Sequence, residues 1–190
     1  PSSSNYPSER RPQDMGTLYN VLRDAGQQRS HDDWVKRIDA LGAQGRWSDS
    51  IDMLEEVIQS NLDPSVKTHT AAMRSCAVWR RWQHALALMN DLQGRDLTPS
   101  AGTYDAAIAA CRGASRNDLV LQLFGKMRLR GMQPSAESYS GAIRAHGMAK
   151  RHGDALALLQ ELWDRGVEPG ERCYRAAMQA CAAAGQWHSE

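Results

Sequence analysis

The sequence predicts an all-α fold, a right-handed α-solenoid of stacked helix-turn-helix hairpins with four full repeats and a half-repeat at each end. Two residue series share one period of 35 residues. The first is a proline series, at Pro64, Pro99, Pro134 and Pro169. The second is an arginine series, at 46, 81, 116 and 151. Apolar residues at helical spacing lie between them, so each period contains two helices.

Each period contains two apolar stripes. In one period the first stripe is formed by Tyr104, Ala107, Ile108 and Cys111, an i, i+3, i+4, i+7 pattern. The second stripe of the same period is formed by Leu121, Leu123, Phe124 and Met127. A hairpin of this size cannot bury its apolar faces alone, so neighbouring hairpins must stack. Stacking by itself permits either hand of coil, and the right hand is our expectation.

The chain divides into repeat units that each end just after the proline. Repeat 1 is 31–65, repeat 2 is 66–100, repeat 3 is 101–135 and repeat 4 is 136–170. Partial units occupy 14–30 and 171–190, so the predicted solenoid is 14–190. Residues 1–13 are rich in Ser and Pro and are expected to form a flexible tail. Such a start is what removal of an organelle transit peptide leaves, although simple trimming gives the same appearance.

The phrase "RGMQPS" at 130–135 predicts the end of a hairpin. Glycine at Gly131 and Gly166 suits a left-handed helix end, and the proline three residues later cannot continue the helix. Asn61 can adopt the same left-handed backbone, and Asp96 is a weaker substitute. The phrase therefore ends one hairpin and directs the chain into the next.

Composition excludes several classes of partner. The chain of 190 residues has 23 basic and 22 acidic residues, a formal charge of +1. No strong global field attracts nucleic acid or an anionic membrane, so such a partner needs a local patch. No apolar run approaches the ~20 residues that cross a bilayer.

These features together resemble the pentatricopeptide repeat family. The resemblance rests on the 35-residue hairpin, an aromatic residue early in the first helix, a pattern such as "ALALM" in the second, and the closing "RGMQPS" or "RGVEPG". It covers nearly everything after residue 13. It implies binding of single-stranded RNA at about one base per repeat, mostly in mitochondria and chloroplasts.

In that family the fifth and last residues of a unit read the base edge, and the second packs on the base face. The resemblance implies four reading pairs here: Val35 with Ser65, Thr70 with Ser100, Asp105 with Ser135, and Ser140 with Gly170. No unit ends in the Asp or Asn that the best-reading pairs carry. The usually aliphatic second residue is replaced by Asp32, Lys67, Gly102, Glu137 and Arg172.

The RNA-binding candidates combine these reading residues with cations on the same helix wall. They are Thr70, Ser100, Asp105, Ser135, Ser140, Gly170, Lys67, Arg74, Arg112, Arg144 and Arg175. The cations alternate with Asp32, Asp39, Asp105 and Glu137, so the stripe is mixed, with its basic end toward the C-terminus. A solvated polar face is the competing interpretation.

A protein-interaction scaffold of a large organellar complex, such as a ribosome or a membrane assembly, is the alternative function. Its candidate surface residues are Trp79, Trp163, Tyr174, Met178 and Cys181. The final helix, "CYRAAMQACAAAG", is apolar on its packing side, so we expect a partner or further chain to cover 171–190. A second set of tryptophans shares one place in the repeat and is interpreted as packing wedges: Trp47, Trp82 and Trp187.

The sequence contains no catalytic motif, and we predict no enzyme, no cofactor and no metal. GxGxxG, phosphate-loop, HExxH and GxSxG patterns are all missing. The eleventh residues of four units are Cys76, Cys111, His146 and Cys181. Stacked helices lie about 8 to 10 Å apart, too far for these side chains to share one zinc ion. They are expected to be core residues, with the cysteines reduced.

Overall fold

The computed structural model describes residues 31–59 and 65–183, and every regular element in these ranges is an α-helix of 13 residues. The first helices of the units are α2 (His31–Ala43), α4 (Val66–Val78), α6 (Ala101–Gly113), α8 (Ala136–Met148) and α10 (Glu171–Ala183). The second helices are α3 (Trp47–Gln59), α5 (Trp82–Gly94), α7 (Asn117–Leu129) and α9 (His152–Asp164). The predicted tail, the partial unit at 14–30, Asn61, Pro64 and Trp187 lie outside the described residues.

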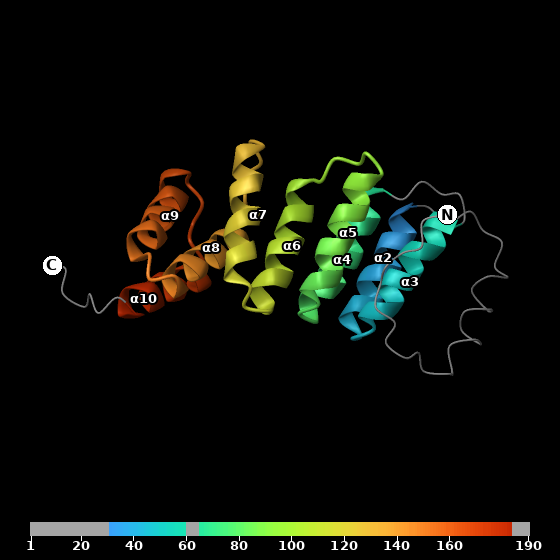
Figure 1. The fold of residues 1–190 in the computed structure, drawn as a ribbon, viewed down its shortest axis with the longest axis horizontal. Helices are drawn as coiled ribbons and strands as arrows, with labels where there is room; N and C mark the ends of the chain where they lie inside the picture. The colour runs from blue at the N-terminus through green and yellow to red at the C-terminus, as the bar shows by residue number, and fades with distance from the viewer. Residues whose placement is uncertain (1–30, 60–64, 184–190) are drawn as a thin grey trace.

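The helices form a single stack of hairpins, which confirms the predicted all-α solenoid. In Figure 1 the helix pairs follow one another from α2 and α3 to α10 along the long axis of the molecule. The first helices α2, α4, α6 and α8 each pack on their own second helix, and the first helices of neighbouring units pack on one another. The predicted stripes form the core, since Tyr104, Ala107, Ile108 and Cys111 are each at most 1% exposed.

Small residues let the first helices approach one another closely. A Cβ atom on Gly147 of α8 would lie 2.7 Å from Cβ of Ala180 in α10. On Gly42 of α2 it would lie 2.9 Å from Cβ of Ser75 in α4. Both distances are shorter than a carbon–carbon contact allows, so the first-helix stack depends on side chains of this size.

In the described residues, the turns within and after the hairpins use a left-handed residue. The turn that ends a unit has positive φ at Asp96 (58°), Gly131 (68°) and Gly166 (68°), as the sequence predicts. The turn between the two helices also has positive φ, at the fifteenth residue of each of the four repeats: Gly45, Arg80, Ser115 and Lys150. The sequence predicts a break between the two helices but not its left-handed residue, because three of these four residues are types that rarely adopt φ above zero.

The stack changes direction between repeats 3 and 4. In Figure 1, α8 and α10 lie at a clear angle to α4 and α6. The contact of α8 with α6 is smaller than the other contacts between first helices, and its contact with α7 is larger than those at the other unit boundaries. Arg144 of α8 occupies this junction, where its Nη2 donates to the backbone carbonyl of Arg112 at 2.6 Å.

Candidate nucleic-acid interface

The second, fifth, ninth and twelfth residues of the first helices form one polar wall, which we call the first-helix face. Ion pairs between equivalent places in neighbouring units run along it. In repeats 1 and 2, Lys67 pairs with Asp32 at 3.6 Å and Arg74 with Asp39 at 2.7 Å. Each cation there meets one carboxylate, so this half of the face is locally neutral.

The other half of the first-helix face has an excess of arginine. Glu137 accepts ion pairs from both Arg112, at 2.9 Å, and Arg172. Arg144 lies beside them and has no acidic partner among the described residues. Two guanidinium groups therefore share one carboxylate, and a third, that of Arg144, lies close to Arg112. Arg175, farther along α10, pairs with Glu171 one turn earlier.

Arg144 is the least compensated cation of this group. Its Nη2 is bonded to the carbonyl of Arg112, but its Nε is buried with no hydrogen-bond partner in the described part of the chain. Burial and, secondly, the nearby charge of Arg112 lower the pKa of Arg144 from its usual value. A donor in this state favours an anionic acceptor, because an unpaired buried N–H is costly.

The fifth residues of the units differ in how far their polar groups are available. Thr70 is 7% exposed, and its hydroxyl bonds to the carbonyl of Val66 at 2.7 Å and to the hydroxyl of Thr103 at 2.8 Å. Asp105 accepts from the hydroxyl of Ser138 at 2.5 Å and from the backbone N–H of Ser135. In both repeats, contacts to the next unit occupy the polar group that the family resemblance assigns to base reading.

The last residues of the first three units cap the following helices. Ser65, Ser100 and Ser135 each accept a hydrogen bond from the backbone N–H three residues later. Serine is among the preferred residues at this place, and the bond satisfies one donor that the helix leaves free. Their hydroxyls therefore have a structural use that sequence reasoning did not assign.

An open pocket remains between repeat 4 and the half-repeat that follows it. It has a volume of about 280 Å³ and is lined by Ser140, Gly170, Glu137, Arg172 and Cys173, among others. These include the fifth, last and second residues of repeat 4 and the second residue of the next unit. The hydroxyl of Ser140 makes no hydrogen bond to the described residues, and Ser140 is 5% exposed at this site. The structure thus brings Ser140, Gly170 and Arg172 together.

The predicted partner-surface residues do not form one patch. Trp79 is 46% exposed at the end of α4, where its Nε1 donates to the carbonyl of Gly42 at 3.0 Å. Trp163 is 54% exposed on α9. Tyr174 and Met178 lie one turn apart on α10, at 39% and 66% exposure, with Cys181 half-buried on the same helix.

The repeated tryptophans begin the second helices and stack against arginine of the next unit. The guanidinium of Arg81 lies 4.7 Å from the ring centroid of Trp47, and that of Arg116 lies 4.4 Å from Trp82. Each pair connects neighbouring hairpins, which agrees with the packing interpretation. Two members of the arginine series, Arg81 and Arg116, make these contacts.

The described residues offer no reactive centre. The four cysteines are free thiols, and Cys76, Cys111 and Cys173 are buried. Burial raises the pKa of Cys76 to about 12 and that of Cys111 to about 11, so neither is a thiolate near neutral pH. Within the described ranges, no group of three or more His, Cys, Asp or Glu side chains is placed to hold a metal ion. None of the helices described is long and apolar enough to span a bilayer.

Comparison with known families agrees with this architecture. A family model for the pentatricopeptide repeat domain matches residues 87–149, and a model for the PPR repeat matches 137–167. Residues 87–167 therefore carry pentatricopeptide repeats. Among curated protein sequences, no match to it was found.

Solved structures of pentatricopeptide repeat proteins are similar to this chain. PPR10 from maize is 24% identical over 90% of the chain, with a TM-score of 0.65. PPR10 in complex with an 18-nt psaJ RNA element is 20% identical over 89%, with a TM-score of 0.68, and the chain covers 26% of its length. The PPR domain of Arabidopsis thaliana protein-only RNase P 1 in complex with tRNA is 12% identical over 79% of both chains, with a TM-score of 0.66. At these identities the likeness shows the fold, and this chain spans about a quarter of PPR10.

Proposed function

We propose that this chain is a non-catalytic pentatricopeptide repeat module that binds single-stranded RNA within an organellar ribonucleoprotein. The observation that carries the proposal is a group of three arginines beside the open pocket at Ser140: Arg112 and Arg172 share the carboxylate of Glu137, and Arg144 contacts the backbone of Arg112. RNA binding derives much of its affinity from phosphate contacts with Arg and Lys. This cluster is the part of the first-helix face with surplus positive charge.

The residues at this site offer three different kinds of contact to RNA. Arg144 and Arg112 are suited to contact phosphates, because guanidinium groups match phosphate oxygens with parallel donors. Ser140 and the backbone at Gly170 offer hydrogen bonds to the edge of one base in the pocket. Arg172 offers a planar group on which an unstacked base can stack. Repeats 2 and 3 lack such an opening, since Thr70 and Asp105 bond to the following unit.

The structural neighbours support RNA as the ligand class. PPR10 was solved with an 18-nt RNA element, and the PPR domain of the plant RNase P with tRNA. The organellar setting rests on the family resemblance alone. A fluorescent fusion of the natural full-length protein, viewed beside mitochondrial and plastid markers, tests it directly.

A protein scaffold of a large organellar complex is the second candidate. It is favoured by α10, on which Tyr174 is 39% exposed and Met178 66% exposed, whereas the equivalent Tyr139 and Ile143 of α8 are 2% and 0% exposed. Internal units bury these places, so α10 presents a surface that further chain or a partner subunit would cover.

The deciding experiment is a salt series of binding to a fluorescein-labelled 12-nt single-stranded RNA. If the protein binds RNA, the affinity should fall as the salt concentration rises. Arg144→Ala should weaken the binding, and Arg74→Ala should change it less. Arg74 is the matched control, because it is also the ninth residue of its unit but is paired with Asp39. The RNA should keep its length on a denaturing gel after incubation with the protein, which tests the proposal that the protein is non-catalytic. Binding that is undetectable at ~50 mM salt, where electrostatic contacts are strongest, favours the scaffold.

A further inference from the structure

A carboxylate joins the two helices of repeat 2 at the end where the unit closes. Asp91 of α5 lies 3.1 Å from Nε2 of the buried His69 of α4, and Nε of Arg95 donates to the same oxygen at 2.8 Å. Although burial opposes it, the hydrogen bonds from Arg95 and His69 hold the pKa of Asp91 below its usual value. These are the fourth, twenty-sixth and thirtieth residues of the unit.

Repeat 4 builds the same three-residue contact from different side chains. The hydroxyl of Tyr139 donates to Glu161 at 3.0 Å, and Nη2 of Arg165 pairs with the same oxygen at 2.8 Å. Arg128 from the preceding unit also reaches Glu161, at 3.2 Å. In both repeats the acid at the twenty-sixth place neutralises the arginine at the thirtieth.

Repeat 3 lacks this acid. Its equivalent residues are Tyr104, Lys126 and Arg130, so a second cation replaces the carboxylate. The guanidinium of Arg130 lies 5.8 Å from the ring centroid of Tyr104. Neither Lys126 nor Arg130 has an acidic partner in the described part of the chain. Both are exposed at the end of α7, and the helix dipole there compensates them only partly.

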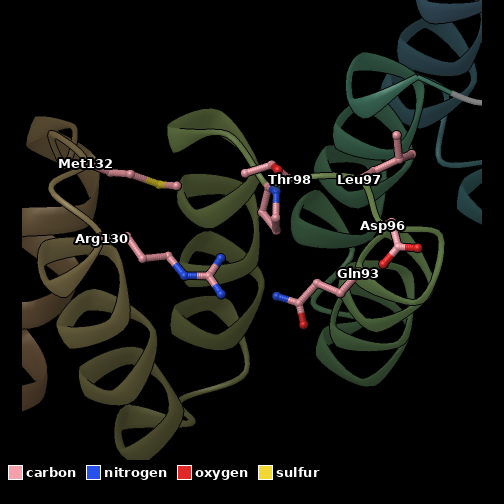
Figure 2. Close-up of a pocket in the computed structure, with 7 residues that line it drawn as sticks. Gln93, Asp96, Leu97, Thr98, Arg130 and Met132 are labelled. Atoms are coloured by element: carbon pink, nitrogen blue, oxygen red, sulfur yellow. The ribbon is translucent and has the colours of Figure 1, made fainter.

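The unpaired arginine lines a pocket of about 630 Å³ between repeats 2 and 3. Figure 2 shows Arg130 extending into it from α7, with Gln93 on the opposite side. Leu97 and Met132 contribute apolar groups, and Asp96 lies at the wall on the side of repeat 2. The pocket therefore combines one free cation, an amide, apolar surface and one acid.

An apolar residue next to the pocket is unusually open to solvent. Leu129, directly before Arg130, is 90% exposed, the largest value among the exposed large hydrophobic residues described. Exposed apolar groups beside an uncompensated cation are typical of a protein-binding surface more than of a solvated helix end.

We propose that this pocket binds a short peptide segment of a partner protein that carries a carboxylate side chain next to a large apolar one. The carboxylate takes the place that Asp91 and Glu161 fill in the neighbouring repeats, accepting hydrogen bonds from Arg130 and Gln93. The apolar side chain packs on Met132 and Leu97. A peptide fits better than RNA, because it presents a single carboxylate and backbone N–H donors, whereas successive phosphates would be repelled by Asp96.

The test uses the whole ¹⁵N-labelled protein and a minimal probe, acetyl-Leu-Glu-Leu-amide, followed by NMR. We expect saturable shifts of the side-chain N–H signals of Arg130 and Gln93, with a dissociation constant of ~1 mM for so small a ligand. The probe with Gln in place of Glu is expected to bind at least about fivefold more weakly, since a neutral amide loses the charge-assisted bonds.

Two variants separate this role from simple folding effects. Arg130→Ala should abolish the shifts, and Lys126→Glu should weaken binding about fivefold while keeping Arg130, because it restores the internal acid of repeats 2 and 4. Arg165→Ala, at the equivalent place in repeat 4, is the control and should bind the probe as the wild type does. Equal binding of both probes, or undiminished binding by Lys126→Glu, overturns the proposal. So does a 12-nt RNA that shifts Arg130 and displaces the probe, because the pocket would then belong to nucleic acid.

Discussion

Replacing Glu137 by Gln is expected to strengthen RNA binding and steepen its dependence on salt. Arg112 and Arg172 both pair with the carboxylate of Glu137, and Gln keeps its size while removing its charge. The substitution leaves Arg144 and the pocket at Ser140 in place. It therefore raises the positive charge of the site without removing any group that we assign to RNA.

The size of the effect follows from the two arginines that are released. A phosphate contact to single-stranded nucleic acid contributes about 0.7 to the slope of log affinity against log salt. Two additional contacts raise that slope by at most about 1.4. Between 50 and 200 mM salt, a fourfold range, this corresponds to an extra loss of affinity of about sevenfold. Arg144→Ala works in the opposite direction, with a decrease in slope of about 0.7.

Fluorescence anisotropy with the same 12-nt RNA at 50, 100 and 200 mM salt measures both slopes. Asp39→Asn is the matched control, since it frees Arg74 in the neutral half of the first-helix face. If the C-terminal half of the first-helix face binds the RNA, the slope of log affinity against log salt should change little in this control. The reasoning is refuted if Glu137→Gln leaves the slope at its wild-type value, or if Asp39→Asn increases it equally.

Three further predictions concern stability. Gly147→Ala should destabilise the fold by about 1 to 3 kcal/mol in urea unfolding, because its Cβ meets Ala180, whereas Gly153→Ala, with open space around it, should not. Ser100→Ala removes the cap of α6 and should cost about 1 kcal/mol in the same assay. Asp91→Asn should lower the melting temperature at pH 7. Because the folded-state pKa of Asp91 is lowered, its contribution is present above the usual value of 3.8 and disappears as acid protonates it, so the two melting temperatures should converge at low pH.

The fold follows from the sequence because its signals repeat. Helix starts recur at His31, Val66, Ala101, Ala136 and Glu171, the first residues of the units defined by the proline series. One ambiguous stripe is weak evidence, but the same stripe in several units is strong. The change of direction before α8 has no such signal. At this junction Arg144 donates to the carbonyl of Arg112, whereas the equivalent Arg74 of repeat 2 pairs with Asp39.

The candidate site was harder to predict, because hydrogen bonds to the next repeat decide which polar groups remain available. Thr70 and Ser140 are both small hydroxyl residues at the fifth place of a unit. In repeat 3, Thr103 forms a hydrogen bond with Thr70 of repeat 2. In the half-repeat after repeat 4, the equivalent residue is Cys173, which lies beside Ser140 in the pocket. In both cases the neighbour that decides whether the hydroxyl is free lies 33 residues further along the chain. Only the stacked structure shows that the two residues are neighbours.

The same stacking is the reason why, under the proposed function, we expect charge to contribute more to RNA binding than base reading does. A group that bonds to the next unit stabilises the solenoid but loses its freedom to recognise a base, and Thr70, Ser100 and Asp105 all bond in this way. Arg144 cannot complete its bonds internally, since its Nε lacks a partner among the described residues. If the proposed function is correct, we expect the arginines of the first-helix face to hold an RNA strand by charge, with its sequence preference concentrated at the pocket between α8 and α10.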